Sequence, residues 1–239
     1  AQGPLSDRQI VGLHCRTHVH QFCDSMDRRL EPELITYGAA VSACGRRVQW
    51  HKAMGILADM RSRCLEPNII IYNAAISACG KGFQWHEAMG LVADVSSRRL
   101  EPDVITYNAA VSACQKGTFS HGAFNMLTNM RLQRVEPDVI TYNSAISACG
   151  SAGHWQEAFG LFSAMQVRRL HCDVITHNAV LSACEKASQW HMALSTLLDM
   201  PLRHVEPDVI SHNAAISACG NGGCWQDALS LMCDLRVRR

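Results

Sequence analysis

Apolar positions along this chain recur at helical spacing, twice in every 35 residues. In residues 104–138, the side chains of Tyr107, Ala110, Val111 and Cys114 fall at i, i+3, i+4 and i+7, on one face of a helix. A second stripe, in residues 69–103, comprises Trp85, Ala88, Met89, Val92 and Val95. Each stripe predicts an amphipathic helix, so the repeating unit is predicted to be a helical hairpin.

Glycine and proline separate the predicted helices. Gly117 is expected to end the first helix of its repeat, as are the glycines in residues 80–82 and 150–153. Pro102 follows the second helix because proline cannot continue it. Pro201 lies near the end of the second helix of its own repeat, so we expect that helix to be shortened.

Arginine pairs such as Arg98–Arg99 and Arg168–Arg169 stand near the predicted ends of second helices. We expect them in the last turn, where cations meet the negative end of the helix dipole. Direct contact with a bound ligand is the less favoured interpretation of these arginines.

Several residue types mark the same 35-residue step. Glutamate and proline recur at Glu31–Pro32, Glu66–Pro67, Glu101–Pro102, Glu136–Pro137 and Glu206–Pro207, with His171–Cys172 in the remaining slot. The step is shared by Cys44, Cys79, Cys114, Cys149, Cys184 and Cys219, and by Trp50, Trp85, Trp155, Trp190 and Trp225, with Ser120 in the vacant tryptophan slot. We therefore divide the chain into a degenerate N-terminal repeat or cap, residues 1–33, and a repeat array, residues 34–239. The repeats are 34–68, 69–103, 104–138, 139–173, 174–208 and an incomplete 209–239.

A single hairpin of this length cannot bury its own apolar face, so neighbouring repeats must stack to form a core. The predicted fold class is all-α, a right-handed α-solenoid of helix-turn-helix repeats.

Composition and charge argue against three classes of protein: disordered, membrane-spanning and uniformly basic chains. A hydrophobic fraction of 48% argues against general disorder, and no run of 18 uninterrupted apolar residues predicts a membrane span. Lys plus Arg total 22 and Asp plus Glu 21, which excludes a uniformly basic coat but not a local basic strip. Because the chain opens on Ala1 with no initiator Met, signal peptide or visible transit peptide, we interpret it as a fragment.

The 12 cysteines include no CxxC motif. Helices pack about 8–10 Å apart, so cysteines in equivalent slots are too distant for a disulfide or a shared zinc. We predict no metal site and small buried thiols at the periodic positions. The periodic tryptophans are predicted to pack in the core rather than to stack on RNA. The histidines that follow them, His51, His86, His121 and His191, are predicted to lie on an exposed helix face.

The repeated unit V-I-T-Y-N-A-A-I-S-A-C-x-K-G, closed by E-P-D, resembles the pentatricopeptide repeat in its plain 35-residue (P-type) form. The resemblance covers residues 34–239 and implies binding of single-stranded RNA, one base per repeat. It also implies a location in the mitochondrion or chloroplast.

The resemblance assigns base reading to the fifth and last residues of each repeat. The fifth residues are Gly38, Asn73, Asn108, Asn143, Asn178 and Asn213, and the last residues are Asn68, Asp103, Asp138, Asp173 and Asp208. The second residues, which sandwich bases in the family, are Ile35, Ile70, Ile105, Ile140, Ile175 and Ile210. Basic residues associated with the RNA backbone are Arg46, Lys81, Lys116 and Lys186, whereas Ser151 and Asn221 depart from that pattern.

Four consecutive repeats, residues 69–208, carry the Asn–Asp pair that the family associates with uracil and, less strongly, with cytosine. An amide offers one donor and one acceptor, which match adjacent groups on a pyrimidine edge. The array is therefore predicted to read about four nucleotides of a U-rich or pyrimidine-rich tract. The asparagines alone are equally compatible with helix capping, and Gly38 offers repeat one no amide.

The leading functional hypothesis is an RNA-binding adaptor that acts in organellar RNA processing, stability or translation, with RNA-processing or translation factors as further partners. The alternative is a protein-interaction scaffold of the tetratricopeptide type. No motif supports catalysis, since a zinc deaminase would need HxE with CxxC. We expect no cofactor, no membrane and no small-molecule substrate.

Overall fold

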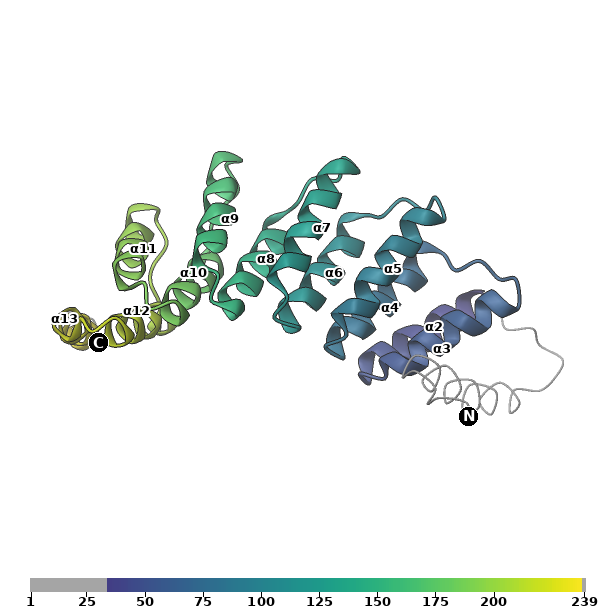
Figure 1. Ribbon diagram of the computed structural model, residues 1–239, viewed down its shortest axis with the longest axis horizontal. Helices are drawn as coiled ribbons and strands as arrows, with labels where there is room; N and C mark the ends of the chain where they lie inside the picture. Colours follow the sequence, from purple (N-terminus) through teal and green to yellow (C-terminus); the bar gives the residue numbers. More distant parts are fainter. Residues whose placement is uncertain (1–33, 238–239) are drawn as a thin grey trace, which may run out of the picture. The chain divides into compact units, whose positions relative to one another are not determined.

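The computed structural model describes residues 34–237, and all regular structure in that range is α-helical. The described residues form two compact units: unit 1 ends at Ala113 and unit 2 begins at Cys114. Helix pairs follow one another along the chain within each unit (Figure 1). The degenerate cap predicted for residues 1–33 lies outside the described residues.

The helices alternate between a first and a second helix of nearly equal length. The first helices are α2 (Leu34–Arg46), α4 (Ile69–Lys81), α6 (Val104–Lys116), α8 (Val139–Ala152), α10 (Val174–Lys186) and α12 (Val209–Asn221). The second helices are α3 (Trp50–Ser62), α5 (Trp85–Ser97), α7 (Ser120–Leu132), α9 (Trp155–Val167), α11 (Trp190–Leu202) and α13 (Trp225–Val237). Each first helix starts at the first residue of a predicted repeat, and each second helix starts at the tryptophan slot. The prediction of an all-α solenoid of helical hairpins is confirmed.

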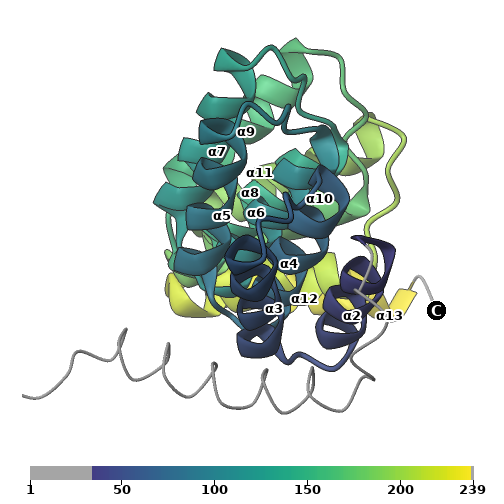
Figure 2. The ribbon, with the colours of Figure 1, turned by 90° about the vertical axis from the view of Figure 1, so that its right-hand side faces the viewer.

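First helices form the centre of each unit. In unit 1, α4 packs against α2, α3 and α5 (Figure 2). The buried side chains there include Val41, Leu57, Tyr72 and Ile76. In unit 2, α10 packs against α8, α9, α11 and α12. The core of each unit is therefore shared between successive hairpins, as stacking requires.

Two glycines expected to end helices lie inside them. Gly80 is within α4 and Gly150 within α8. A Cβ on Gly80 would lie 3.1 Å from the Cβ of Ala113, and one on Gly150 would lie 2.9 Å from the backbone oxygen of Ala179. These glycines permit close approach of consecutive first helices, and the helices end within the predicted segments, at the C-cap residues Gly82 and Gly153.

Most helix ends carry a residue with positive φ, and it is usually not glycine. After α6, Thr118 has φ 54°, and the Phe119 N–H donates to the oxygen of Cys114 (2.9 Å). Arg99 takes the same conformation after α5, so the arginine pair follows the helix instead of lying in its last turn.

Pro201 does not shorten its helix. It lies in the last turn of α11, which has the same 13 residues as the other second helices. A proline there removes only one hydrogen-bond donor close to the helix end, where the lost bond has little effect on the preceding turns.

The tryptophans are half-buried, and Trp225 is 62% exposed, so their prediction as core residues was wrong. The Trp50 ring fills the space beside Gly82 in the following repeat, where a Cβ would lie 2.3 Å from its Cδ1. The same ring stacks on His51 with ring centroids 3.4 Å apart. The histidines are exposed, as predicted.

The periodic cysteines are buried as predicted, except for Cys44, which is half-buried. All are free thiols. Burial raises the pKa of the thiols of Cys79, Cys149 and Cys184 to about 12 and that of Cys114 to about 11. These groups therefore act as small apolar side chains near neutral pH.

Between residues 34 and 237, no helix combines the length and the apolar character needed to cross a membrane. Among the same residues, no cluster of three or more His, Cys, Asp or Glu side chains could hold a metal ion.

The tight contact at Gly150 predicts opposite effects for two glycine substitutions in neighbouring helices. We expect Gly150→Ala to lower the free energy of unfolding by about 1 kcal/mol or more, because overpacking outweighs the gain in helix propensity. Gly160→Ala in α9, where nothing lies within 4 Å of the new Cβ, should raise it by about 0.5–1 kcal/mol. Urea denaturation of both variants measures the difference, and stabilisation by both would contradict the packing constraint.

The positive φ of Thr118 predicts that glycine is better at this position. Left-handed backbone costs an L-residue about 1–2 kcal/mol, and glycine loses about 0.5–1 kcal/mol in chain entropy. Thr118→Gly should therefore raise the free energy of unfolding by about 0.5–1 kcal/mol. The reverse change, Gly153→Thr at the equivalent position with φ 76°, should lower the free energy of unfolding. Calorimetry of both variants measures these changes, and changes of the same sign would contradict a left-handed backbone at this position.

Candidate functional site

A three-residue polar network joins two consecutive repeats in unit 1. The Asn73 Nδ2 donates to Asp103 Oδ1 (3.3 Å), and Asn73 Oδ1 accepts a hydrogen bond from the Thr106 hydroxyl (2.6 Å). Asn73 is the fifth residue of its repeat and Asp103 the last, as the sequence paired them. Thr106, the third residue of the following repeat, was not predicted to take part.

The same network occurs twice in unit 2. Asn143 donates to Asp173 (3.4 Å) and accepts from the Thr176 hydroxyl (2.6 Å). The second copy joins Asn178 to Asp208 (3.3 Å) and to the Ser211 hydroxyl (2.6 Å). The recurrence over two units identifies the network as a property of the repeat junction.

The aspartate, and not the asparagine, caps the first helix of the next repeat. Thr106 N–H donates to Asp103 Oδ1 and Thr176 N–H to Asp173 Oδ1, both at 2.8 Å. An acceptor in this position satisfies a backbone donor that the helix leaves unpaired. The interpretation of the periodic asparagines as caps was therefore wrong.

The carboxylates of Asp103, Asp173 and Asp208 have lowered pKa values. Partial burial acts to raise each pKa, but hydrogen bonds outweigh it. For Asp173 these come from the backbone N–H and the hydroxyl of Thr176 and from the Asn143 amide. The ionised carboxylate can only accept hydrogen bonds, so it faces the N–H end of the amide.

The amide keeps part of its hydrogen-bonding capacity. Nδ2 carries two hydrogens and Oδ1 two lone pairs, while the network uses one of each at Asn73 and Asn143. Asn178 accepts one hydrogen bond in the same way, and its Nδ2 lies 3.3 Å from both carboxylate oxygens of Asp208. All three side chains are half-buried. The amides of Asn73 and Asn143 thus keep one donor beside one acceptor.

The second residue of every repeat is an exposed isoleucine. The exposed fractions run from 63% to 79% for Ile35, Ile70, Ile105, Ile140, Ile175 and Ile210. Each lies three residues before the position of the amide, near the start of a first helix. The isoleucines therefore leave an apolar side chain accessible at the same position of every repeat.

The four basic residues assigned to the RNA backbone are the last residues of their first helices and are exposed: Arg46, Lys81, Lys116 and Lys186. The Lys186 Nζ donates to the backbone oxygen of Ser151, 35 residues earlier (3.1 Å). This lysine therefore also links the ends of two consecutive first helices.

Repeat one and the array end differ from the other repeats. The Ile71 side chain packs over Gly38, where a Cβ would lie 3.6 Å from Ile71 Cγ1. Asn68, the last residue of that repeat, caps α4 by accepting from the Ile71 N–H (3.1 Å). Asn213 is exposed on α12.

The remaining predicted pair is divided between the units. Asn108 lies half-buried on α6 in unit 1, and Asp138 in unit 2 caps α8 by accepting from the Thr141 N–H (2.8 Å).

A serine, histidine and glutamate lie together in unit 2 but do not form a nucleophile relay. Ser120 Oγ lies 2.9 Å from His154 Nδ1, and the same nitrogen lies 3.3 Å from Glu157 Oε2. A relay needs the nucleophile and the carboxylate on different ring nitrogens.

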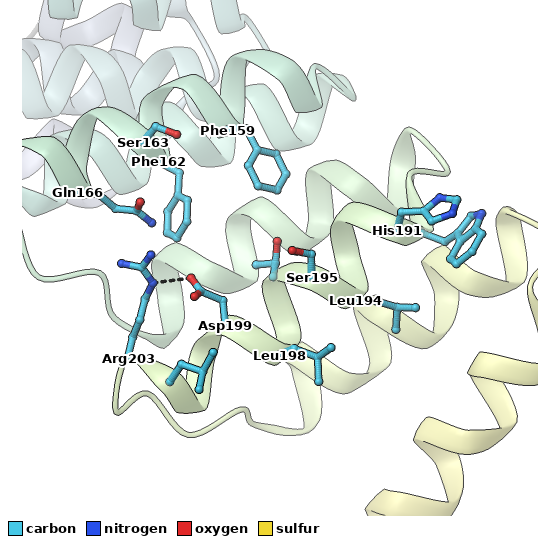
Figure 3. Close-up of a pocket in the computed structure, with 13 residues that line it drawn as sticks. Phe159, Phe162, Ser163, Gln166, His191, Leu194, Ser195, Leu198, Asp199 and Arg203 are labelled. Carbon is cyan, nitrogen blue, oxygen red and sulfur yellow. Dashed lines mark hydrogen bonds and ion pairs between the residues drawn. The ribbon is translucent and has the colours of Figure 1, made fainter.

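A groove of about 750 Å³ lies between α9 and α11 in unit 2 (Figure 3). It is lined by residues from these two second helices and Arg203, including Phe159, Phe162 and Leu198. Asp199 and Arg203 form an ion pair in it. None of the predicted base-reading residues lines this groove.

Stacked helical hairpins, with a hydrogen-bonded Asn–Asp pair at three of their junctions, define a helical repeat protein of the solenoid class. Family models of this class match the chain: "Pentatricopeptide repeat domain" over residues 22–82 and 90–152, "PPR repeat family" over residues 137–186, and "PPR repeat" over residues 70–100, 175–205 and 210–239. The chain belongs to the pentatricopeptide repeat family. No curated protein sequence matches it.

Solved structures share the fold. The pentatricopeptide repeat protein PPR10 from maize matches with a TM-score of 0.67 and 25% identity, covering 87% of this chain and 30% of that chain. PPR10 in complex with an 18-nucleotide psaJ RNA element matches with a TM-score of 0.64 and 21% identity, covering 95% of this chain and 32% of that chain. The PPR domain of Arabidopsis thaliana protein-only RNase P 1, in complex with tRNA, matches with a TM-score of 0.56 and 17% identity. The match covers 67% of this chain and 86% of that chain. This chain thus spans about a third of the length of the maize protein.

The lowered pKa of Asp173 predicts acid-sensitive stability. A carboxyl whose pKa is lower in the folded than in the unfolded state stabilises the fold above the unfolded pKa, and this contribution disappears as pH falls through the folded pKa. We expect the melting temperature to fall on acidification from about pH 5 to pH 3, and to fall less in Asp173→Asn, which keeps a capping oxygen but has no charge. Thermal melts followed by circular dichroism measure this. Glu206→Gln, an exposed carboxylate in the turn before α12, serves as the control, and equal acid sensitivity in Asp173→Asn and the unaltered chain would contradict the prediction.

Proposed function

We propose that this chain binds single-stranded RNA, with one base at each repeat junction and a preference for a uracil-rich or pyrimidine-rich tract. The observation that carries the proposal is the Asn–Asp pair, held in the same hydrogen-bonded form at Asn73, Asn143 and Asn178. Each amide has one N–H and one oxygen lone pair to offer, and a pyrimidine presents complementary groups side by side on its pairing edge.

The exposed isoleucines support the proposal. A base is an apolar plate with polar edges, so its faces need apolar contacts while its edge is read. Ile140 and Ile175, both more than 60% exposed, stand in consecutive repeats on the helices that carry Asn143 and Asn178. A base next to either amide therefore has an aliphatic side chain available to each face.

The basic residues at the ends of first helices support a contact to phosphate. Lys81, Lys116 and Lys186 recur at one register, while the chain as a whole has a net charge of only +1. So few positive charges give only a modest affinity for phosphate. These charges are confined to one track of the surface.

The similarity to PPR10 and to the RNase P domain, both solved with RNA, favours RNA over other ligands. We infer from the family resemblance that the chain acts in the mitochondrion or chloroplast, in RNA processing, stability or translation. It acts there by occupying its RNA and recruiting processing or translation factors, without chemistry of its own.

A second candidate function is that of a protein-interaction scaffold. The groove between α9 and α11 favours it, because Leu198 and Leu202 are 71% and 80% exposed there. Peptide binding in that groove would leave the asparagine network unused.

Binding to homopolymeric oligonucleotides tests the RNA proposal. We expect oligo-U to bind tightest, oligo-C next, and oligo-A and oligo-G at least about tenfold more weakly, because an unmade hydrogen bond to a buried polar group costs about 1–3 kcal/mol. The double variant Asn143→Ser, Asn178→Ser should shift the preference toward purines, since a shorter side chain leaves room for the larger ring. Fluorescence anisotropy gives the dissociation constants, and Asn129→Ser on the exposed face of α7 is the matched control.

Salt dependence separates the two candidate functions. RNA affinity should fall with a slope of log K against log salt of about −0.7 for each phosphate contacted. Equal affinity for all four oligonucleotides, or a base preference unchanged by the double variant, would rule out base reading by these amides.

A further inference from the structure

At three repeat junctions, the hydroxyl on the third residue of a repeat lies within the asparagine–aspartate network of the repeat before it. We propose that this hydroxyl, on Thr106, Thr176 and Ser211, is a positioning group that fixes the direction of the preceding asparagine amide and thereby selects uracil over cytosine. The inference rests on the proposed RNA-binding function and adds a residue to its site.

The geometry is the same at all three junctions. Each hydroxyl oxygen lies 2.6 Å from the asparagine Oδ1 of the previous repeat and 2.8–2.9 Å from the Oδ1 of the aspartate between them. The hydroxyl has one proton for these two acceptors. The position of that proton decides how the network is connected.

Only one amide direction satisfies the three groups together. With Oδ1 toward the hydroxyl, the asparagine accepts the hydroxyl proton and its Nδ2 donates to the aspartate at 3.3–3.4 Å. If the amide is turned over, its N–H can donate to the hydroxyl oxygen, but its own oxygen then faces a carboxylate oxygen at that distance, and neither of these two oxygens has a proton to donate. The carboxylate and the hydroxyl therefore hold opposite ends of the amide.

Burial makes the hydroxyl difficult to replace. Thr106, Thr176 and Ser211 are each 0% exposed, so no solvent water has access to the amide oxygen from that side. Removal of the hydroxyl leaves Asn143 held by Asp173 alone and leaves its oxygen without a donor.

The direction of the amide matters because uracil and cytosine present opposite orders of donor and acceptor. Uracil offers the O4 acceptor beside the N3–H donor, whereas cytosine offers an N4–H donor beside the N3 acceptor. An amide that is free to turn reads either base. An amide held in one direction reads one order and leaves unpaired groups against the other.

The sequence contains an internal counterpart. Repeat one has Gly38 at the fifth position and therefore no amide to orient, and the third residue of the next repeat is Ile71. Its side chain packs over Gly38. The hydroxyl is thus missing at the one junction that has no amide.

The test compares Thr176→Val, which keeps the shape of the side chain, with Thr176→Ser, which keeps the hydroxyl. RNAs with a single U→C change at each position of a U tract are titrated against each protein. We expect Thr176→Val to reduce the penalty for cytosine at least threefold at one nucleotide, with the other positions unchanged, and Thr176→Ser to behave as the unaltered chain. Thr106→Val should reduce the penalty for cytosine at a different nucleotide. Thr128→Val, on the second helix α7, should not reduce it at any nucleotide.

A second measurement, without RNA, separates this inference from the proposed function. Nuclear magnetic resonance relaxation of the Asn143 side-chain amide should show an ordered group that becomes mobile in Thr176→Val and remains ordered in Thr176→Ser. If Thr176→Val weakened RNA binding equally at all nucleotides and left the Asn143 amide ordered, the inference would be overturned and Thr176 would have a purely structural role. A mobile amide in Thr176→Val, in a chain that binds no RNA, would support the positioning role and refute the proposed function.

Discussion

One carboxylate oxygen, on Asp103, Asp173 or Asp208, is the constraint on which the rest of the repeat junction depends. Asp173 Oδ1 caps α10 by accepting from the Thr176 N–H and also accepts from the Asn143 amide of the previous repeat. The start of one helix and the direction of a side chain on another are therefore fixed by the same atom. Because a hairpin has no core of its own, any change in how two repeats stack also moves the amide relative to its neighbours.

Features decided within a few residues could be predicted from the sequence. The i, i+3, i+4 stripes gave both helices of every pair, and the tryptophan slot gave the start of the second helix at Trp85 and Trp190. Burial of the periodic cysteines also followed, since Cys79 and Cys184 lie on the apolar stripe of a first helix. The pairing of Asn73 with Asp103 came from family resemblance, because nothing local links two residues 30 positions apart.

Features decided between repeats could not be predicted in this way. Trp50 has the spacing of a core residue, but its ring lies against Gly82 of the next repeat and on its neighbour His51. Gly150 has the composition of a helix breaker, but its role is set by the oxygen of Ala179 on the next first helix. The partner of the Thr176 hydroxyl lies 33 residues earlier, while its own neighbours in sequence indicate only an ordinary first helical turn. In each case the deciding atom belongs to another repeat, and no periodicity in the chain reports it.

The boundaries of the recognition unit therefore differ from those of the structural repeat. The helical hairpin runs from position 1 to position 35, but the network that orients Asn143 extends through Asp173 to Thr176, the third residue of the next hairpin. An exchange of whole repeats between arrays would separate the amide from the hydroxyl that directs it whenever the following repeat begins with a sequence like that around Ile71. Under the proposed function, the unit that would transfer base preference intact runs from the fifth residue of one repeat to the third of the next, because only that segment includes both groups that hold the amide.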